Sequence, residues 1–513
     1  MLAHVLSGAV FGIEGIKITI EVDYNSRSVA GFTIVGLPGT AVQESRERVR
    51  AAIKNIGCEF PMRRFTVNLA PADIRKEGPS FDLPIAIGVL VATEQLRADQ
   101  IADSMFIGEL ALDGKLRHVC GAINLALLAK QEGIRKIYVP VEDAPEAAQI
   151  DGVEVFPVPS LGHLVEHLFG MQPIPPFDRA QLRHEDLRPA ERAVDFAQIK
   201  GQEYVKRAME VAAAGNHNIL LVGPPGAGKT LIARALPGIL PPLTPEEALE
   251  ITRIYSVADL LPADRRMARR RPFRAPHYTI SQAGLVGGGS TPRPGELTLA
   301  HRGVLYLDEL VEFGHKLEVL RQPLEDKVVT ISRASGSLTF PANVMLVGSM
   351  NPCPCGYYGD NLQPCTCGEA AVRRYQQRLS GPILDRFDIH LDVRRVDYEK
   401  LVTTQAAESS ETVQARVVAA REQQLARYRD YPHIRANSDL TASEIDRFCP
   451  ITEDGAMLLQ NAMRRLNLSA RAYHRVLKLG RTIADLEGAA TITLAHIAEA
   501  IQYRSRLMTA LQG

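Results

Sequence analysis

The chain has 513 residues, of which 46% are hydrophobic and 23% charged, so it can form about three folded domains and is not disordered throughout. Its 59 basic and 59 acidic residues cancel, which excludes attraction of the whole protein to nucleic acid or to an anionic membrane. The N-terminus lacks the basic start of a signal peptide, and no run of about 18 apolar residues occurs. We therefore expect a cytoplasmic protein with no membrane partner.

The first 160 residues alternate between strand-like and helix-like patterns, which favours a mixed α/β domain. Strands are expected over residues 17–22, 65–69 and 136–139, with a helix over 123–132. Thr40 and Gln43 have the spacing of a capping box that opens another helix. Prolines and polar residues then predict a linker over 161–195.

A second α/β domain is expected over residues 196–400, and helical patterns dominate residues 401–513. Within the second domain an apolar strand ends in a glycine-rich motif and a helix follows, the context that a phosphate-binding loop requires. The loop amides would surround phosphate oxygens, Lys229 would reach the β- and γ-phosphates, and the Thr230 hydroxyl would bind Mg²⁺. The expected ATP-binding residues are Gly223, Pro224, Pro225, Gly226, Ala227, Gly228, Lys229 and Thr230.

Three later positions add polar groups to this site. The apolar strand 303–307 runs into Asp308 and Glu309, which would hold Mg²⁺ and orient or deprotonate the attacking water, respectively. A second apolar strand, 344–347, leads to Asn351, whose amide could contact the γ-phosphate or align the water. Arg386 could stabilise transition-state charge in a neighbouring subunit, although an exposed structural role is the default for one arginine.

Four of the seven cysteines lie within residues 353–367, in two Cys-x-Cys pairs separated by nine residues. They are Cys353, Cys355, Cys365 and Cys367. Four thiolates fill the tetrahedral shell of one structural zinc and leave no open position for water. Unliganded reduced thiols and a strained redox pair are the alternatives.

Together these motifs resemble those of a magnesium-chelatase-like AAA+ ATPase, and longer phrases resemble the ComM/YifB family. Those phrases include NPCPCGYYGD, LSGPILDRFDIHLDV and LSARAYHRVLKLGRTIADLEG. The resemblance covers nearly the whole chain. It implies that Asn351 is sensor 1, that Arg386 acts in trans as an arginine finger, and that Arg471 is sensor 2 on the helical lid. The chain departs from the family pattern at Val311 and Tyr278, outside the phosphate chemistry.

The resemblance also implies a Lon-protease-like fold for the N-terminal domain. Ser80 stands in a segment similar to that around the Lon nucleophile, yet the lysine that Lon supplies near position 123 is missing. Because a serine nucleophile needs an activating base, we interpret Ser80 as structural.

Six arginines occur within residues 265–274, where the resemblance implies a hairpin directed toward the pore of a ring. A run of arginines is usually a solvated face, but here it is the best site for phosphates of DNA. The expected DNA contacts are Arg269, Arg270, Arg271 and Arg274.

By resemblance, the chain is expected to be an ATP-dependent DNA motor that forms a homo-oligomeric, hexameric ring. Its function would be helicase-driven branch migration of single-stranded or branched DNA in homologous recombination and natural transformation. The alternatives are the motor subunit of a metal chelatase and a Lon-type ATP-dependent protease. Expected cofactors are ATP and Mg²⁺, with zinc at the cysteine loop.

Overall fold

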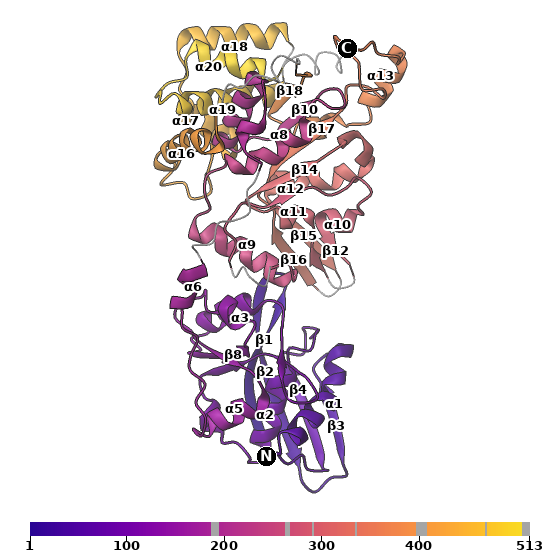
Figure 1. Cartoon of the computed structure of the whole chain (residues 1–513), viewed down its shortest axis with the longest axis vertical. Helices are drawn as coiled ribbons and strands as arrows, with labels where there is room; N and C mark the ends of the chain where they lie inside the picture. Colours follow the sequence, from indigo (N-terminus) through magenta and orange to yellow (C-terminus); the bar gives the residue numbers. More distant parts are fainter. Residues whose placement is uncertain are drawn as a thin grey trace. The chain divides into compact units, whose positions relative to one another are not determined.

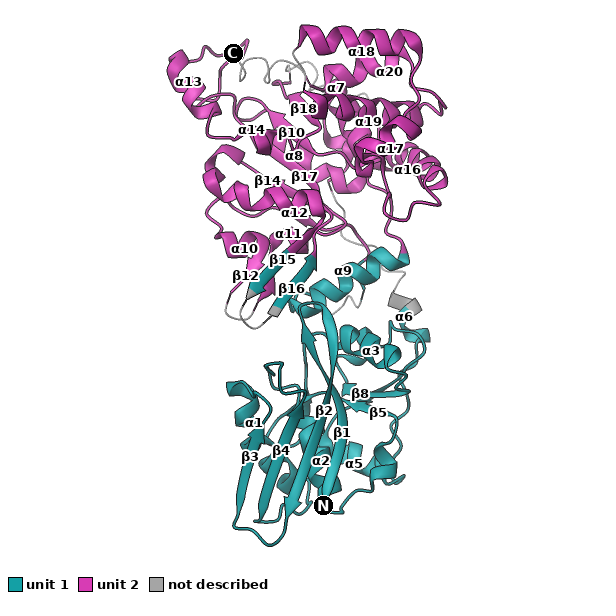
Figure 2. Cartoon of the chain, turned by 180° about the vertical axis from the view of Figure 1, so that it is seen from behind, with its two compact units in different colours: residues 1–189, 245–268, 330–340 teal, residues 190–244, 269–329, 341–513 magenta. Residues whose placement is uncertain are grey.

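The computed structural model describes residues 1–185, 194–261, 267–289, 292–333, 336–396, 408–466 and 469–504 (Figure 1). The described chain divides into two compact units. One unit contains Met1–Pro189, Pro245–Ala268 and Thr330–Phe340, and the other contains Ala190–Thr244, Arg269–Val329 and Pro341–Gly513 (Figure 2). None of the described helices is long and apolar enough to cross a bilayer.

The first unit is built on a seven-stranded mixed sheet in the order β3-β4-β2-β1-β5-β8-β9. The strands are β1 (Leu2–Phe11), β2 (Glu14–Asn25), β3 (Gly31–Val35), β4 (Arg64–Ala70), β5 (Ser104–Phe106), β8 (Lys136–Pro140) and β9 (Glu154–Val158). β1, β2 and β4 pair antiparallel, whereas β1, β5, β8 and β9 pair parallel. The strands expected from the sequence at β2, β4 and β8 are confirmed.

Alternating side chains of this sheet enter two cores, because successive residues of a strand point to opposite faces. Val5 packs with the fully buried helix α2 (Asp82–Ala92), alongside α1 (Thr40–Asn55). Its neighbour Leu6 packs with α3 (Ala122–Gln131), on the other face. The helix at α1 is confirmed, but its capping box is wrong: the N-cap is Gly39, with no side-chain cap.

Two segments from the expected ATPase region fold with the N-terminal unit. They are helix α9 (Pro245–Val257) and the hairpin of β15 (Val328–Arg333) and β16 (Gly336–Pro341). Leu249 of α9 packs against the α3 core, and Ser256 donates a hydrogen bond of 2.5 Å to the buried Glu146. The expected linker also differs, because helix α5 (Leu161–Leu168) buries Leu161, Leu164 and Val165. Residues 186–193 of that linker lie outside the described residues.

The second unit contains a five-stranded sheet in the order β11-β14-β17-β10-β18, with every pair parallel. The strands are β11 (Phe273–Arg274), β14 (Val304–Leu307), β17 (Met345–Met350), β10 (Ile219–Val222) and β18 (Ile389–Asp392). All residues of β10, β14 and β17 are buried, as expected for a parallel sheet covered on both faces.

Helices surround this sheet and continue to the end of the described chain (Figure 1). The longer helices before residue 400 are α7 (Glu203–Gly215), α8 (Lys229–Ala235) and α13 (Glu369–Gln376). The C-terminal helices are α16 (Ser410–Arg427), α17 (Ala442–Phe448), α18 (Glu453–Arg465), α19 (Ala470–Leu486) and α20 (Leu494–Gln502). Buried side chains of the sheet and of these C-terminal helices form one core, for instance Ile219, Val476 and Ile497. The expected helical C-terminal region is therefore confirmed over its described residues; residues 401–407 and 505–513 lie outside them.

Candidate functional site

The glycine-rich motif forms a turn between β10 and α8. Gly226 and Gly228 have φ of 76° and 87°, in the left-handed region that glycine adopts without strain. Gly223 permits a close backbone approach, because a Cβ there would lie 2.1 Å from the carbonyl oxygen of Val393. The motif's three glycines therefore each meet a geometric need of a loop whose amides can surround phosphate.

Lys229 and Asn351 meet at this turn. The Lys229 ammonium donates hydrogen bonds to the carbonyl oxygens of Gly223, at 2.6 Å, and Pro224, at 3.0 Å, and to Oδ1 of Asn351, at 3.1 Å. Burial lowers the pKa of Lys229, while the carboxylate of Asp308 acts in the opposite direction. The structure thus brings together two residues that lie 122 positions apart and that the sequence assigned to the same phosphate.

The two expected Mg²⁺ ligands also come together. Thr230 Oγ1 donates a hydrogen bond of 3.2 Å to Oδ2 of Asp308. Adjacent ligands of an octahedral Mg²⁺ lie about 3.0 Å apart when each metal–oxygen distance is about 2.1 Å. A hydroxyl and a carboxylate at this separation therefore fit two neighbouring positions of a magnesium shell.

Two further residues, which the sequence reasoning missed, hold this pair in place. Ser349 donates a short hydrogen bond to Oδ1 of Asp308, and the single proton of the Tyr306 hydroxyl is shared between Ser349 Oγ, at 3.1 Å, and Thr230 Oγ1, at 3.3 Å. Burial raises the pKa of Tyr306 to about 12, so this hydroxyl keeps its proton. The available signal was a hydroxyl group within each of two otherwise apolar strands.

Glu309 lies where β14 ends, with an exposed side chain. Its φ of 52° is in the left-handed region, which is unusual for a residue other than glycine. The Glu309 N–H donates to Oδ1 of Asp308 at 3.1 Å. Among the described contacts, the Glu309 carboxyl has no hydrogen bond with Thr230, Asp308 or Ser349, which suits a residue that orients water.

Arg386 lies apart from these groups. Its guanidinium forms an ion pair of 2.7 Å with Glu325 and borders a cavity of about 170 Å³ that Arg475 also lines. Burial lowers the pKa of Arg386, Glu325 raises it, and the nearby Arg471 lowers it further. Arg471 is exposed in the first turn of α19, which Ser469 caps. Among the described contacts, Arg386 has none with the phosphate loop of its own chain.

Arg271 and Arg274 of the arginine segment form hydrogen bonds within the protein. Arg271 donates hydrogen bonds to the carbonyl oxygens of Pro241, at 2.7 Å, and Arg302, at 2.8 Å. Arg274 forms a bidentate ion pair with Glu296, with nitrogen–oxygen distances of 2.6 and 2.7 Å. These guanidinium groups hold the chain in place. Arg270 is exposed and Arg269 is half-buried. Arg265 and Arg266 of the same run, and residues 290–291 of the following glycine-rich stretch, lie outside the described residues.

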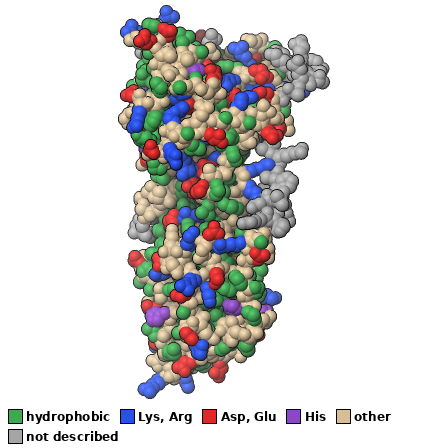
Figure 3. Space-filling model, turned by 90° about the vertical axis from the view of Figure 1, so that its left-hand side faces the viewer, with side chains coloured by type: hydrophobic (Ala, Val, Ile, Leu, Met, Phe, Trp, Pro, Cys, Tyr) green, Lys and Arg blue, Asp and Glu red, His purple; other side chains and the backbone are tan. Residues whose placement is uncertain are grey.

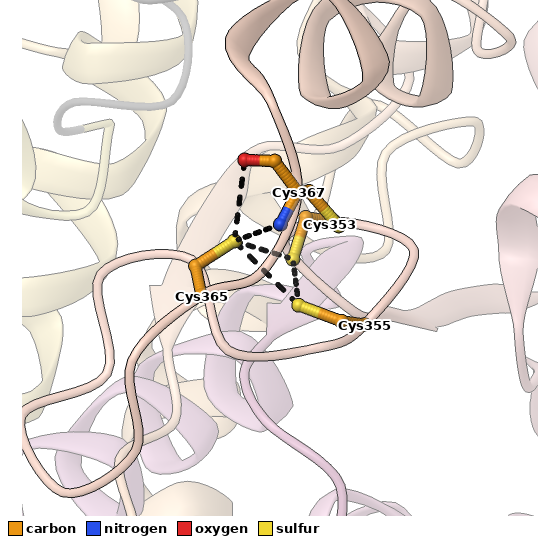
Figure 4. A group of neighbouring side chains, drawn as sticks. All are labelled: Cys353, Cys355, Cys365 and Cys367. Atoms are coloured by element: carbon orange, nitrogen blue, oxygen red, sulfur yellow. Dashed lines mark hydrogen bonds between the residues drawn. The ribbon is translucent and has the colours of Figure 1, made fainter.

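The four clustered cysteines converge on one point (Figure 4). The Sγ atom of Cys353 lies 3.3 Å from that of Cys355 and 3.7 Å from that of Cys365. The Sγ atoms of Cys355 and Cys365 are 3.5 Å apart. Sulfur ligands of a tetrahedral zinc lie about 3.8 Å apart, given a zinc–sulfur distance of about 2.3 Å. The described residues contain no disulfide at this loop. The geometry is therefore compatible with a single zinc ion held by four thiolates.

Backbone groups of the loop favour thiolate, and the loop adjoins the nucleotide motif. N–H groups at Tyr357 and Thr366 lower the pKa of the Cys355 thiol, whereas desolvation and the neighbouring cysteines raise the pKa values of Cys365 and Cys367. Gly356 has φ of 88°, and a Cβ there would lie 2.5 Å from the Pro225 ring. The cysteine loop thus packs directly on the phosphate loop.

Comparison with known protein families matches three parts of the chain to models of one magnesium chelatase subunit. Residues 195–401 match "Magnesium chelatase, subunit ChlI" and residues 20–143 match "Subunit ChlI of Mg-chelatase". Residues 407–504 match "Magnesium chelatase, subunit ChlI C-terminal". The phosphate loop, Asp308, Asn351 and Arg386 all fall within the first match.

Individual relatives extend the likeness to the full chain. YifB of Salmonella typhimurium is 43% identical over 516 residues, covering 100% of this chain and 99% of YifB. The competence protein ComM of Haemophilus influenzae is 42% identical over 506 residues, covering 98% of this chain and 97% of ComM. Lon protease 2 of Bacillus subtilis is 24% identical over 172 residues, covering 32% of this chain and 30% of that protease. The expected α/β fold class, with its chelatase-like and Lon-like parts, is confirmed.

We expect the cysteine loop to hold about one zinc per chain, because four thiolates complete one tetrahedral shell. Cys353→Ser should remove about one equivalent of zinc, measured by elemental analysis of protein purified without chelator, and should lower activity at the nucleotide motif through the loop's packing on Pro225. Cys58→Ser, which changes an isolated thiol in the other unit, is the control and should leave the zinc content unchanged. Equal zinc content in both variants would exclude metal from this loop.

Proposed function

The chain belongs to the ComM/YifB family of magnesium-chelatase-like AAA+ proteins, and we propose that it is an ATP-driven DNA motor. In this proposal the subunits form a homohexameric ring that hydrolyses ATP with Mg²⁺ and promotes branch migration in homologous recombination and natural transformation. The name of the Haemophilus relative, a competence protein, supports a role in competence.

One observation carries the ATPase part of the proposal: the 3.2 Å contact of Thr230 with Asp308, beside the Lys229–Asn351 pair. Bound Mg²⁺ supplies positive charge to the β- and γ-phosphates. Lys229 would exchange its carbonyl partners for phosphate oxygens, and Asn351 would hold the γ-phosphate or the attacking water. Glu309 would orient that water and accept its proton, since its carboxyl group is not engaged by Thr230 or Ser349.

The position of Arg386 supports action on a neighbouring subunit. In its own chain its charge is partly balanced by Glu325, and Arg471 and Arg475 lie close to it. A phosphate presented by another subunit would offer this group of arginines an anion. An arginine supplied in trans can accelerate phosphoryl transfer by about 10³- to 10⁵-fold. A ring would bring each Arg386 to the next subunit's site.

For DNA, we propose that Arg269 and Arg270 contact phosphates, because Arg270 is exposed and Arg269 is half-buried. Arg271 and Arg274 would hold the segment in shape through their hydrogen bonds. Binding by such contacts is local rather than a property of the whole surface. Lys, Arg, Asp and Glu side chains are interspersed over the face shown in Figure 3, in keeping with the zero net charge. The decisive experiment is ATP-dependent movement of a branched DNA substrate by the purified protein. Stimulation of ATP hydrolysis by a porphyrin with a partner protein, and not by DNA, would instead indicate a chelatase motor.

Lys229→Ala should weaken ATP binding, because it removes the ammonium from the phosphate loop. Glu309→Gln should bind ATP normally but hydrolyse it roughly 10²- to 10⁴-fold more slowly, the usual effect of losing a general base. Nucleotide titration and steady-state hydrolysis separate the two effects. Glu312→Gln, which changes a carboxylate paired with Arg378 in the same segment, is the control and should retain activity. Equal loss of ATP binding in both Lys229→Ala and Glu309→Gln would contradict the assignment of Glu309.

Mixed rings test action in trans. Arg386→Ala and Lys229→Ala subunits should each be inactive alone, but a mixture should recover part of the ATPase rate, because some sites then combine an intact loop with an intact finger. Mixing Lys229→Ala with Glu309→Gln is the control: both changes act within one site, so no complete site can form. Absence of recovery in the first mixture would contradict the inter-subunit role of Arg386.

The double variant Arg269→Ala/Arg270→Ala should weaken DNA binding and reduce the slope of log K against log salt by about 0.7 to 0.9 for each lost phosphate contact. Basal ATP hydrolysis should remain, while its stimulation by DNA should fall. Arg464→Ala/Arg465→Ala, a change of two exposed adjacent arginines on α18, is the matched control. Binding should be measured with single-stranded and with branched DNA. An equal salt slope in both double variants would show that residues 269–270 are only a solvated face.

A further inference from the structure

A second cluster of metal-ligating side chains lies in the unit that contains the N-terminal residues. The ligand atoms of His118, Cys120 and Asp259 lie within 4.8 Å of one another. His118 and Cys120 belong to the loop between β7 (Leu116–Arg117) and α3, and Asp259 follows the end of α9, 141 residues after His118. We propose that these three side chains bind one zinc ion, a site independent of the cysteine loop and of the proposed motor activity.

The geometry and chemistry of the donors fit zinc. His118 Nε2 lies 3.3 Å from Oδ1 of Asp259. Nitrogen and oxygen ligands of a tetrahedral zinc lie about 3.4 Å apart, given metal–ligand distances of about 2.1 Å. A nitrogen, a sulfur and a carboxylate oxygen suit this borderline-soft ion, whereas Ca²⁺ and Mg²⁺ prefer oxygen alone. Three protein ligands leave the fourth position to water.

A buried carboxylate orients the histidine ring. Asp143, whose side chain is 1% exposed, accepts a short hydrogen bond from His118 Nδ1 and a second one, of 2.9 Å, from the Val119 N–H. With Nδ1 held in this way, Nε2 is the nitrogen that faces Asp259. A ligating histidine whose other ring nitrogen donates to a carboxylate is the usual arrangement at zinc sites, where the carboxylate fixes the ring and increases its basicity.

A second buried carboxylate fixes the two segments that carry the ligands. Glu146 accepts hydrogen bonds from the N–H of Ile123, at 2.9 Å, at the start of α3 and from Ser256, at 2.5 Å, near the end of α9. Arg253 also ties α9 to the carbonyl oxygen of Ile13 at 2.9 Å. Because both segments are anchored, the three ligands need little rearrangement to close on an ion.

Two carboxylates face the histidine ring, because Asp143 accepts a hydrogen bond from Nδ1 and Oδ1 of Asp259 lies 3.3 Å from Nε2. Bound zinc would cross-link the loop before α3 to the end of α9, a helix that lies between the phosphate loop and Asp308 in the chain.

The test is titration of the full-length protein with zinc sulfate, with His118→Ala, Cys120→Ser and Asp259→Asn compared with the unaltered protein. Each ligand variant should bind one zinc fewer, and the cysteine loop, unchanged in all of them, contributes equally throughout. Cys58→Ser is the matched control and should bind as the unaltered protein does. Asp143→Asn should weaken zinc affinity about 10- to 100-fold without changing the ligand set. Circular dichroism should be used to check that each variant is folded.

Cobalt gives an independent readout, because Co²⁺ bound to a thiolate has a charge-transfer absorption. The absorption contributed by this site should be absent from Cys120→Ser and present in Cys58→Ser. Retention of the full zinc content and affinity by any one of the three ligand variants would overturn the proposed ligand set. The group would then be a histidine held by hydrogen bonds to two aspartates.

Discussion

The geometry of the phosphate-loop site depends on the carboxylate of Asp308, which links side chains that follow or belong to different strands of the sheet. β17 lies between β10 and β14, so the strands that carry the phosphate loop and Asp308 are two strand spacings apart, roughly 10 Å. Thr230 and Asp308 nevertheless meet directly, at 3.2 Å, beyond the carboxyl ends of these strands. Ser349, near the end of the middle strand, donates to the other oxygen of Asp308, and the Tyr306 hydroxyl lies against both Ser349 and Thr230. The carboxyl edge of the parallel sheet thus carries a network of hydroxyl and carboxylate groups whose spacing fits a magnesium shell.

The cysteine loop adjoins the same edge of the sheet. It begins immediately after Asn351 and packs through Gly356 on Pro225, so it supports both the sensor residue and the phosphate loop. Gln376 of α13 adds a hydrogen bond of 3.0 Å to the carbonyl oxygen of Pro352. A metal centre of four thiolates would stiffen a loop that otherwise contains little regular secondary structure. Its contribution to catalysis would be made through the position of its neighbours.

The sequence could predict the parts of the site that are governed by local rules. Glycines at 226 and 228 meet positive φ angles, and acids directly after a buried strand must lie at a sheet edge. Tyr306 and Ser349 escaped prediction because an isolated hydroxyl in an apolar strand also suits a packed core. That α9 packs with the N-terminal unit could not be predicted either. An amphipathic pattern shows that a helix buries one face, but it does not show which hydrophobic core that face joins. The burial of Leu161 and Leu164 in α5 was not predicted, because the prolines of the same stretch indicated a linker.

Because α9 and most of the β15–β16 hairpin fold with the N-terminal residues, the two units are not consecutive in the sequence. The chain passes from one unit to the other after residues 189, 244, 268, 329 and 340. A fragment that stops before α9 would leave Glu146 without Ser256 and the α3 core without Leu249. The N-terminal unit is therefore incomplete without residues 245–268, and the chain that leads from the phosphate loop to β14 passes through that unit on its way.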